Sequence, residues 1–238
     1  QRLIDARHAF LEGLLPPGDG MRSVLDVGCG FGDYLASFDA RHWRRTGIEL
    51  NAERAGFARA QLGLSVLEQP LESPGIAPGS IDLLCAFGVI EHMYDMRAVF
   101  ASMHACLPLG GLGMLSVADL DNPEQGVGDY FCVEHILSFC KQTLESVAQA
   151  AGFAVVKMGP LTPPEYKDIC CVFRKVRPDF AWQGMSARPQ LARQLAEDVQ
   201  AYIRKRQARI AGMRRRLDEA GLLDARLALG IYGAGGHT

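Results

Sequence analysis

Three glycines at alternating positions, in the stretch Val24-Leu-Asp-Val-Gly-Cys-Gly-Phe-Gly-Asp-Tyr-Leu35, constrain the fold of this chain more than any other feature. An apolar run precedes them and residues with helical apolar spacing follow, so the predicted order is strand, glycine turn, helix. The spacing Gly-x-Gly-x-Gly is one residue shorter than the Gly-x-Gly-x-x-Gly fingerprint that binds a dinucleotide pyrophosphate. The turn therefore predicts a ligand-binding strand–helix unit, and the shorter spacing bears on which cofactor it binds.

Apolar runs and helical patterns alternate over the next ninety or so residues, as in an α/β domain. Strands are expected at 23–27, 45–50, 64–69, 80–87 and 112–118, and helices at 33–41, 51–63 and 96–107. The run Ser-Ile-Asp-Leu-Leu-Cys-Ala-Phe87 is almost continuously apolar, which is typical of a central parallel strand that is buried on both faces. The pattern predicts a doubly wound, Rossmann-like parallel sheet.

The alternation changes after the fifth strand. A helical pattern ends at Gly152, and two strand patterns, 154–159 and 168–176, follow without a helix between them. Two consecutive strands of this kind indicate an antiparallel hairpin at one edge of the sheet. Residues 1–177 are therefore expected to form one domain.

The C-terminal part has a different pattern. Residues 178–189, which begin and end with proline, resemble a linker, and residues 190–222 are expected to form a long, basic, amphipathic helix. The stretch 223–238, which ends in glycines, resembles the first strand of a second, truncated nucleotide-binding domain. We expect the apolar stripe of the helix to pack against the domain or to form a homodimer; a solvated face is the alternative.

Charge and cysteine content limit the possible partners. The formal net charge is -2, which argues against a nucleic-acid partner. The seven cysteines include no Cys-x-x-Cys pair, as in proteins of a reducing compartment. No apolar run reaches the roughly 18 residues that a membrane span needs, so a cytoplasmic location without a membrane span is expected.

An acidic residue follows the second expected strand at the distance that a ribose ligand requires. Glu49 lies 21 residues after Gly28, and a carboxylate at this position accepts hydrogen bonds from ribose hydroxyls. Together with the glycines, Glu49 predicts an adenosine-type ligand. Glycines that only turn a strand into a helix are the alternative.

Four segments, in order, resemble class I S-adenosylmethionine-dependent methyltransferases over roughly residues 20–176. They are LDVGCGFG, GIELN, GSIDLLCAFGVIEHMYD and CLPLGGLGMLSV. The resemblance implies S-adenosylmethionine as the cofactor, S-adenosylhomocysteine as its product, and a seven-stranded sheet whose last strand is antiparallel.

The resemblance also implies the residues that contact the cofactor. The backbone of the glycine turn, including Cys29, contacts the methionyl part, Asp26 orients the ammonium group, and Phe87 lies near the methionyl chain. Glu49 holds the ribose, and the following Leu50 is a further cofactor candidate. Family members often have an acidic residue after the third strand for the adenine amino group, whereas this chain has Pro70. In its place we expect Gln69, Glu72 or backbone groups near Leu71 to contact the adenine. The glycines of the turn are Gly28, Gly30 and Gly32.

Two Glu-His pairs are candidates for acid–base catalysis. Glu134-His135 follows Tyr130 in a segment that partly resembles the acceptor loop of sugar C-methyltransferases, and this resemblance implies that His135 acts as the base. His92, in the other pair, is a second candidate. The alternative for Glu134-His135 is helix capping, and the alternative for Glu91-His92 is a structural or cofactor-proximal role. No metal site is expected, because His92, His104 and His135 have no regular ligand spacing.

Three functions fit the sequence. The first is methyl transfer to a small-molecule acceptor, such as a sugar or a cell-envelope glycan precursor. The second is methylation of a quinone-type, lipophilic acceptor, for which an apolar pocket replaces the acid–base loop. The third is a non-catalytic cofactor-binding scaffold module of a multidomain protein.

Overall fold

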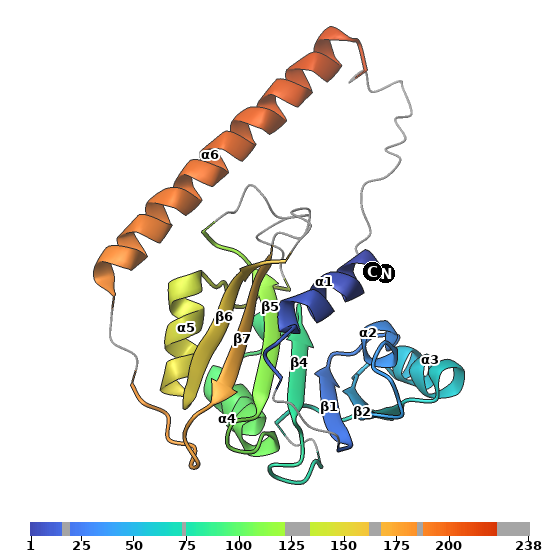
Figure 1. Ribbon diagram of the computed structural model, residues 1–238. Coiled ribbons are helices and arrows are strands. Elements are labelled where there is room, and N and C mark those ends of the chain that lie inside the picture. Colours follow the sequence, from blue (N-terminus) through green and yellow to red (C-terminus); the bar gives the residue numbers. More distant parts are fainter. Residues whose placement is uncertain (16–19, 73–74, 122–133, 162–167, 185–187, 223–238) are drawn as a thin grey trace.

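A seven-stranded sheet lies at the centre of the computed structural model, which describes residues 1–15, 20–72, 75–121, 134–161, 168–184 and 188–222 (Figure 1). The strand order is β3-β2-β1-β4-β5-β7-β6. Strands β1 to β5 are parallel, and β7 is antiparallel to both of its neighbours. The strands are β1 (Arg22–Val27), β2 (Trp43–Ile48), β3 (Ser65–Leu67), β4 (Leu83–Phe87), β5 (Leu112–Ala118), β6 (Phe153–Pro160) and β7 (Asp168–Lys175). The doubly wound sheet and its antiparallel last strand are confirmed.

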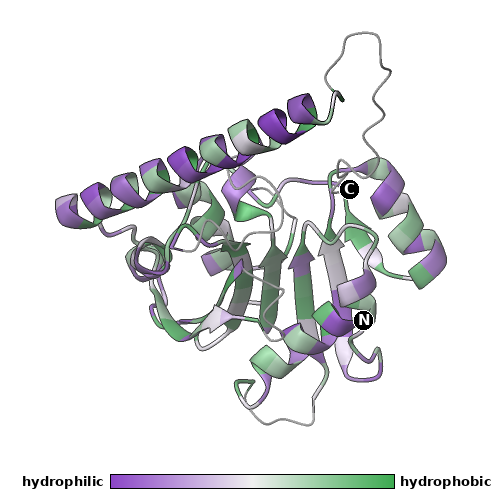
Figure 2. Ribbon diagram, turned by 90° about the horizontal axis from the view of Figure 1, so that it is seen from above, coloured by the Kyte–Doolittle hydropathy of each residue, from purple (hydrophilic) through white to green (hydrophobic). Residues whose placement is uncertain are grey.

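Helices cover both faces of the sheet. Buried side chains of α1 (Arg2–Leu11), α2 (Asp33–Ala36) and α3 (Ala52–Leu62) pack on one face. The opposite face packs against the 3-10 turn η1 (Ile90–His92), α4 (Met96–Cys106) and α5 (Lys141–Ala150). Figure 2 shows the hydrophobic residues concentrated on the strands between these two layers. Because both faces are covered, the central strand β4 is apolar along its whole length.

Local signals explain where α3 begins and ends. The Asn51 side chain accepts a hydrogen bond of 3.0 Å from the Arg54 amide, which satisfies one of the free donors of the first turn. Gly63 follows the last turn with φ of +61°, a conformation that glycine adopts without steric cost. The predicted helix at 51–63 is therefore found within a residue at each end.

Helix α2 is shorter than the sequence predicts. It has 4 residues, whereas the apolar spacing predicts a helix over 33–41. After Ala36 the backbone amides of Ser37 and Phe38 bond to the carbonyls of Tyr34 and Leu35, three residues back. Such tight bonds close a helix rather than extend it. The glycine turn therefore leads into a single helical turn.

The hairpin of β6 and β7 contributes an aromatic cluster to the core. The Phe173 ring of β7 lies 4.7 Å from the Phe153 ring and 6.1 Å from the Phe100 ring, measured between centroids. Gly113 of β5 pairs with Phe173 across the antiparallel ladder, and the ring covers the space where a side chain at Gly113 would lie. The absence of a side chain at Gly113 thus makes room for Phe173.

Helix α6 (Pro189–Glu219) is the long amphipathic helix that the sequence predicts. None of its residues is buried, and Figure 1 shows it outside the two helix layers. Its role as a dimer contact stays a prediction. The expected domain start at 223–238 lies outside the described residues. Among the described helices, none is both long enough and apolar enough to cross a membrane.

We predict that Gly113→Ala destabilises the protein, because the new methyl group overlaps the Phe173 ring. Overpacking of this kind costs about 1–3 kcal/mol of the free energy of unfolding, which urea denaturation measures. The matched control is Gly159→Ala on the edge strand β6, where no described atom lies within 4 Å of the added carbon. An equal change in both variants would contradict the packing role of Gly113.

Candidate functional site

A cavity of about 390 Å³ opens at the carboxyl ends of β1 and β2. In an open parallel sheet, ligands bind beyond the carboxyl ends of the strands, where the strand order reverses. Here the order reverses between β1 and β4, next to this cavity. The cavity is lined by Val27, Gly28, Ile48, Glu49, Leu50, Pro70, Leu71, Glu72, Val89, His92, Met93, Tyr94 and Asp95.

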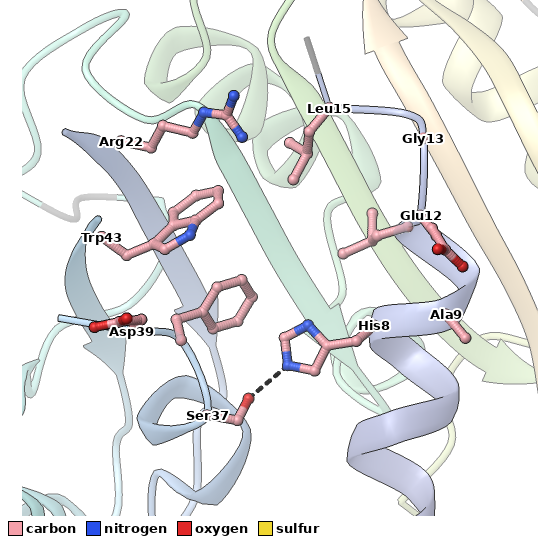
Figure 3. Close-up of a pocket in the computed structure, with 11 residues that line it drawn as sticks. His8, Ala9, Glu12, Gly13, Leu15, Arg22, Ser37, Asp39 and Trp43 are labelled. Carbon is pink, nitrogen blue, oxygen red and sulfur yellow. Dashed lines mark hydrogen bonds between the residues drawn. The ribbon is translucent and has the colours of Figure 1, made fainter. Parts of the chain in front are cut away.

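A second cavity, of about 570 Å³, lies at the opposite ends of the strands (Figure 3). Arg22 and Trp43, which line it, begin β1 and β2, so it borders the amino ends of these strands. In it, Nε2 of His8 lies 2.7 Å from Oγ of Ser37. Because ligand sites of this sheet type form at the carboxyl ends, the first cavity is the candidate functional site.

The glycine turn reaches the candidate site at Gly28, which lines the cavity. Gly28 has φ of +67°, and a side-chain carbon there would lie 2.6 Å from Cγ2 of Val89. At Gly32 the corresponding carbon would lie 2.5 Å from Leu64 and 3.2 Å from Ala58. Gly30 differs, because no described atom lies within 4 Å of that position. Gly28 and Gly32 are thus required by packing within the protein, and Gly30 leaves space for a ligand.

Glu49 connects the glycine turn to the next strand–helix unit. One carboxylate oxygen accepts a hydrogen bond of 2.9 Å from the Gly30 amide. The other accepts one of 2.8 Å from the Asn51 amide. Each carboxylate oxygen has a second lone pair, so Glu49 can also accept hydrogen bonds from a ligand in the cavity.

Asp26 lies beneath the glycine turn and is 3% exposed. Burial raises the pKa of Asp26 to about 7; the positive charge of Arg7 opposes this shift, and the negative charge of Glu49 adds to it. A cationic ligand group near Asp26 would stabilise the carboxylate. The structure therefore places a buried acid of variable charge next to the site.

Arg7 of α1 is a residue of this region that the sequence does not reveal. Its guanidinium lies 3.7 Å from the centroid of the Phe87 ring, and the Tyr34 ring meets Phe87 edge to face at 5.0 Å. Nε of Arg7 is buried and has no hydrogen-bond partner among the described residues. Nothing in the sequence indicates which cation of this N-terminal segment faces the sheet, so sequence reasoning misses Arg7.

The remaining cofactor candidates fall into two groups. Leu50, Pro70, Leu71 and the alternative Glu72 line the cavity. Gln69 is exposed and is not among the lining residues.

Cys29 faces the protein rather than the cavity. Its Sγ atom occupies the space above Gly47, where a side-chain carbon on the glycine would lie 2.5 Å from the sulfur. Burial raises the pKa of the Cys29 thiol to about 12, and the charges of Asp26 and Glu49 add to the shift. A thiol in this environment stays protonated and acts as a small apolar side chain.

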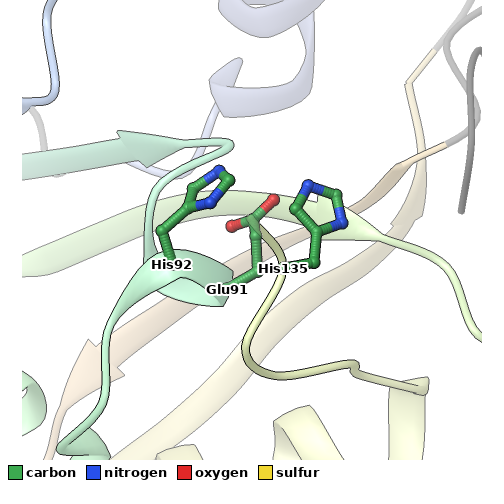
Figure 4. Close-up of side chains that lie close together, drawn as sticks. All are labelled: Glu91, His92 and His135. Atoms are coloured by element: carbon green, nitrogen blue, oxygen red, sulfur yellow. The ribbon is translucent and has the colours of Figure 1, made fainter. Parts of the chain in front are cut away.

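The structure brings Glu91 and His92 of one pair next to His135 of the other (Figure 4), and His92 lines the cavity. The His92 and His135 rings meet at a centroid distance of 4.9 Å, and Nδ1 of His92 lies 2.8 Å from the carbonyl oxygen of Glu134. Glu134 thus contacts His92 through its backbone carbonyl group, and the Glu134 residue is exposed. Tyr130 lies outside the described residues.

Glu91 completes this group. Potential ligand atoms of Glu91, His92 and His135 all lie within 4.8 Å of one another. Burial raises the pKa of Glu91 to about 7. The sequence predicts no metal site, because spacing alone does not show that two segments dock against each other. His104, by contrast, is buried away from this group, and its Nε2 lies 3.0 Å from the Arg177 carbonyl oxygen.

Comparison with known proteins agrees with the fold. A family model described as "Methyltransferase domain" matches residues 1–158. The chain is 28% identical over 122 residues to a ubiquinone biosynthesis O-methyltransferase of Pseudomonas paraeruginosa, a match that covers 49% of this chain and 52% of the relative. The chain thus spans about half the length of the curated relatives it matches.

Solved structures share the fold. One is the 1,6-didemethyltoxoflavin-N1-methyltransferase of Burkholderia thailandensis, with its substrate and S-adenosylhomocysteine bound; its TM-score is 0.56 at 22% identity, over 73% of this chain and 77% of that one. Another is the N-methyltransferase NodS of Bradyrhizobium japonicum, with a TM-score of 0.57 at 18% identity, over 74% and 98% of the two chains.

We predict that Asp26→Asn stabilises the ligand-free protein above neutral pH. Below about pH 4 the Asp26 carboxyl is protonated in both the folded and the unfolded state, so its burial costs little. As the pH rises towards the folded-state pKa of about 7, the Asp26 carboxyl group ionises readily only in the unfolded state. The stability of the wild type therefore falls relative to that of the variant.

At pH 8 the free energy of unfolding of Asp26→Asn is expected to exceed that of the wild type by about 1–3 kcal/mol, and this difference should shrink towards zero near pH 4. Urea denaturation at the two pH values measures it. Asp33→Asn changes an exposed carboxylate of α2 and serves as the control. A gain that is the same at both pH values would contradict a raised pKa at Asp26.

Proposed function

The chain belongs to the family of methyltransferase domains, and from this membership we propose that it transfers a methyl group from S-adenosylmethionine to a hydroxyl oxygen of a small-molecule acceptor. One observation carries the proposal. The Glu49 carboxylate lines the cavity at the carboxyl ends of the strands, and the amides of Asn51 and of Gly30, whose side-chain position is open, hold it in place. Membership in a family of methyltransferases sets aside the non-catalytic scaffold.

Each part of the cofactor has a candidate partner. The Glu49 carboxylate accepts hydrogen bonds from the ribose hydroxyls, and the apolar side chains of Leu50, Leu71 and Val89 enclose the adenine. The ammonium group is drawn to the Asp26 carboxylate, whose ionisation it favours. S-adenosylhomocysteine bound to the similarly folded Burkholderia enzyme supports this assignment.

A quinone-type acceptor is the first candidate for the methylated molecule. The curated relatives are ubiquinone biosynthesis O-methyltransferases, although the match covers half of their length. The cavity wall is largely apolar, and Met93 and Tyr94 extend it beyond the cofactor contacts. Methylation of a sugar or a cell-envelope precursor is the second candidate, which the segment around Glu134-His135 favours.

The polar groups on the acceptor side are His92, His135 and Glu91. His92 lines the cavity and meets the His135 ring, so an acceptor that enters beside η1 encounters both imidazoles. Methyl transfer from a sulfonium needs an aligned nucleophile more than it needs strong acid–base catalysis. We place these residues where they bind and orient the acceptor oxygen.

We predict that S-adenosylhomocysteine raises the melting temperature of the protein and that NAD does not. The alternating glycines and Glu49 fit an adenosine with one short chain, whereas the fingerprint for a pyrophosphate is absent from this turn. Differential scanning fluorimetry with each ligand measures the shifts. Equal shifts with both ligands, or no shift with either, would contradict the assigned cofactor.

Glu49→Gln is expected to weaken S-adenosylhomocysteine binding by about tenfold or more, because a charged acceptor of two hydroxyl groups becomes a neutral amide. Isothermal titration calorimetry measures the affinity. The matched control is Glu53→Gln, which removes an exposed carboxylate in the first turn of α3. Equal affinities of the folded wild type and Glu49→Gln would exclude the ribose contact.

The rate of S-adenosylhomocysteine release, measured with each candidate acceptor, distinguishes between them. We predict turnover with a dihydroxybenzene and none above background with a nucleotide-linked sugar. His135→Ala should lower this turnover by about 10²-fold or more while cofactor affinity stays within about twofold of the wild type. Turnover with the sugar alone would select the second acceptor, and full turnover of His135→Ala would remove His135 from the site.

A further inference from the structure

Glu91, His92 and His135 form a group of nitrogen and oxygen donors at the edge of the cofactor cavity. Glu91 and His92 belong to η1, and His135 lies in the segment before α5. Figure 4 shows the Glu91 carboxylate between the two imidazole rings. Potential ligand atoms of all three side chains lie within 4.8 Å of one another, a separation that one ion can span.

Backbone hydrogen bonds fix the position of His135 relative to η1. The amides of Ile136 and Leu137 both donate to the carbonyl oxygen of Glu91, at 2.9 and 3.0 Å. These bonds dock the segment that carries His135 onto the turn that carries the other two side chains. The three donors therefore belong to one anchored unit.

The hydrogen bond of His92 determines which of its nitrogens is free. Nδ1 of His92 lies 2.8 Å from the carbonyl oxygen of Glu134, and a carbonyl oxygen only accepts. Nδ1 must therefore carry the proton, which leaves the lone pair on Nε2 in a neutral ring. Metal-binding histidines show this arrangement, because a backbone carbonyl fixes the ring and its tautomer.

The Glu91 carboxyl group gives independent support for a cation. The residue is 4% exposed, and its Oε2 atom is buried without a hydrogen-bond partner among the described residues. A buried carboxylate oxygen without a partner is costly, and coordination of a cation is one way to offset the cost. The unpartnered atom belongs to the same group as the two histidines.

We propose that Glu91, His92 and His135 bind a first-row transition-metal dication such as Zn²⁺. Two imidazoles and one carboxylate form a donor set that suits such ions better than Mg²⁺ or Ca²⁺, which take oxygen ligands. Three protein ligands leave a coordination position for water or for an oxygen of a second molecule. Because His92 also lines the cavity, the ion lies at its edge.

The ion gives the three side chains a role in methyl transfer, and this part rests on the proposed function. An acceptor hydroxyl that coordinates the ion releases its proton to solvent more easily. The oxygen then bonds to the methyl carbon while the carbon–sulfur bond breaks, and its electron pair stays on sulfur. The products are the methyl ether, S-adenosylhomocysteine and one proton. His135 then serves as a ligand in place of a general base.

Metal titration tests the site without an acceptor. Protein treated with EDTA and then dialysed is titrated with Co²⁺, and the visible absorption and the bound metal are measured. We expect about one ion per chain in a site of nitrogen and oxygen ligands. His92→Ala, His135→Ala and Glu91→Gln should each weaken binding by about 100-fold, since each loses a direct ligand. The matched control His42→Ala removes an exposed imidazole outside the group and should bind as the wild type does.

Three results would overturn the proposal. They are the absence of stoichiometric binding to the wild type, an unchanged affinity in a folded His135→Ala variant, and the strong absorption of a cobalt–thiolate bond, which would assign the ion to a cysteine. Circular dichroism establishes that each variant is folded. Metal binding without stabilisation by S-adenosylhomocysteine would contradict the proposed function and leave the metal site standing. Stabilisation by S-adenosylhomocysteine without metal binding would contradict the metal site and leave the proposed function standing.

Discussion

Two hydrogen bonds to the Glu49 carboxylate join the turns that follow β1 and β2 at the carboxyl ends of the strands. Its oxygens bind the amides of Gly30 and Asn51, which belong to the turns after β1 and β2. Asn51 in turn caps α3. One side chain thus joins the glycine turn to the second strand–helix unit, and the cavity lies against this junction. The binding of a ribose by the same carboxylate would use a group that the protein has already oriented.

The site also contains polar groups whose burial costs free energy. Asp26 has a raised pKa, and Nε of Arg7 and Oε2 of Glu91 are buried without partners among the described residues. Polar groups of this kind are uncommon in a core and tend to cluster where a ligand completes their interactions. They lie near the carboxyl edge of the sheet, whereas the hydrophobic clusters that stabilise the domain lie along its faces. Stability and function therefore use different parts of the same strands.

Sequence patterns predict the fold well because its determinants are local. Asn51 and Gly63 set the ends of α3, and the apolar run at 112–118 is β5. The length of α2 is wrong in the prediction, because apolar spacing does not show the tight bonds that end the helix at Ser37. The ribose candidate is identifiable from the sequence because adjacent parallel strands place their ends side by side.

The acceptor side is not predictable in the same way. His92 and His135 are far apart in the sequence, and they meet because the segment after Glu134 bonds to the carbonyl of Glu91. Arg7 reaches Phe87 from a helix that precedes the sheet. In the part of the cavity that we assign to the cofactor, the polar groups are backbone amides and the Glu49 carboxylate, and their positions follow from the strand–turn–helix units. Side chains from separate segments form the other half and can change without disturbing the sheet. This division explains why the motifs of the chain identify its family but not its acceptor, which we propose binds at the junction of η1 and the segment before α5.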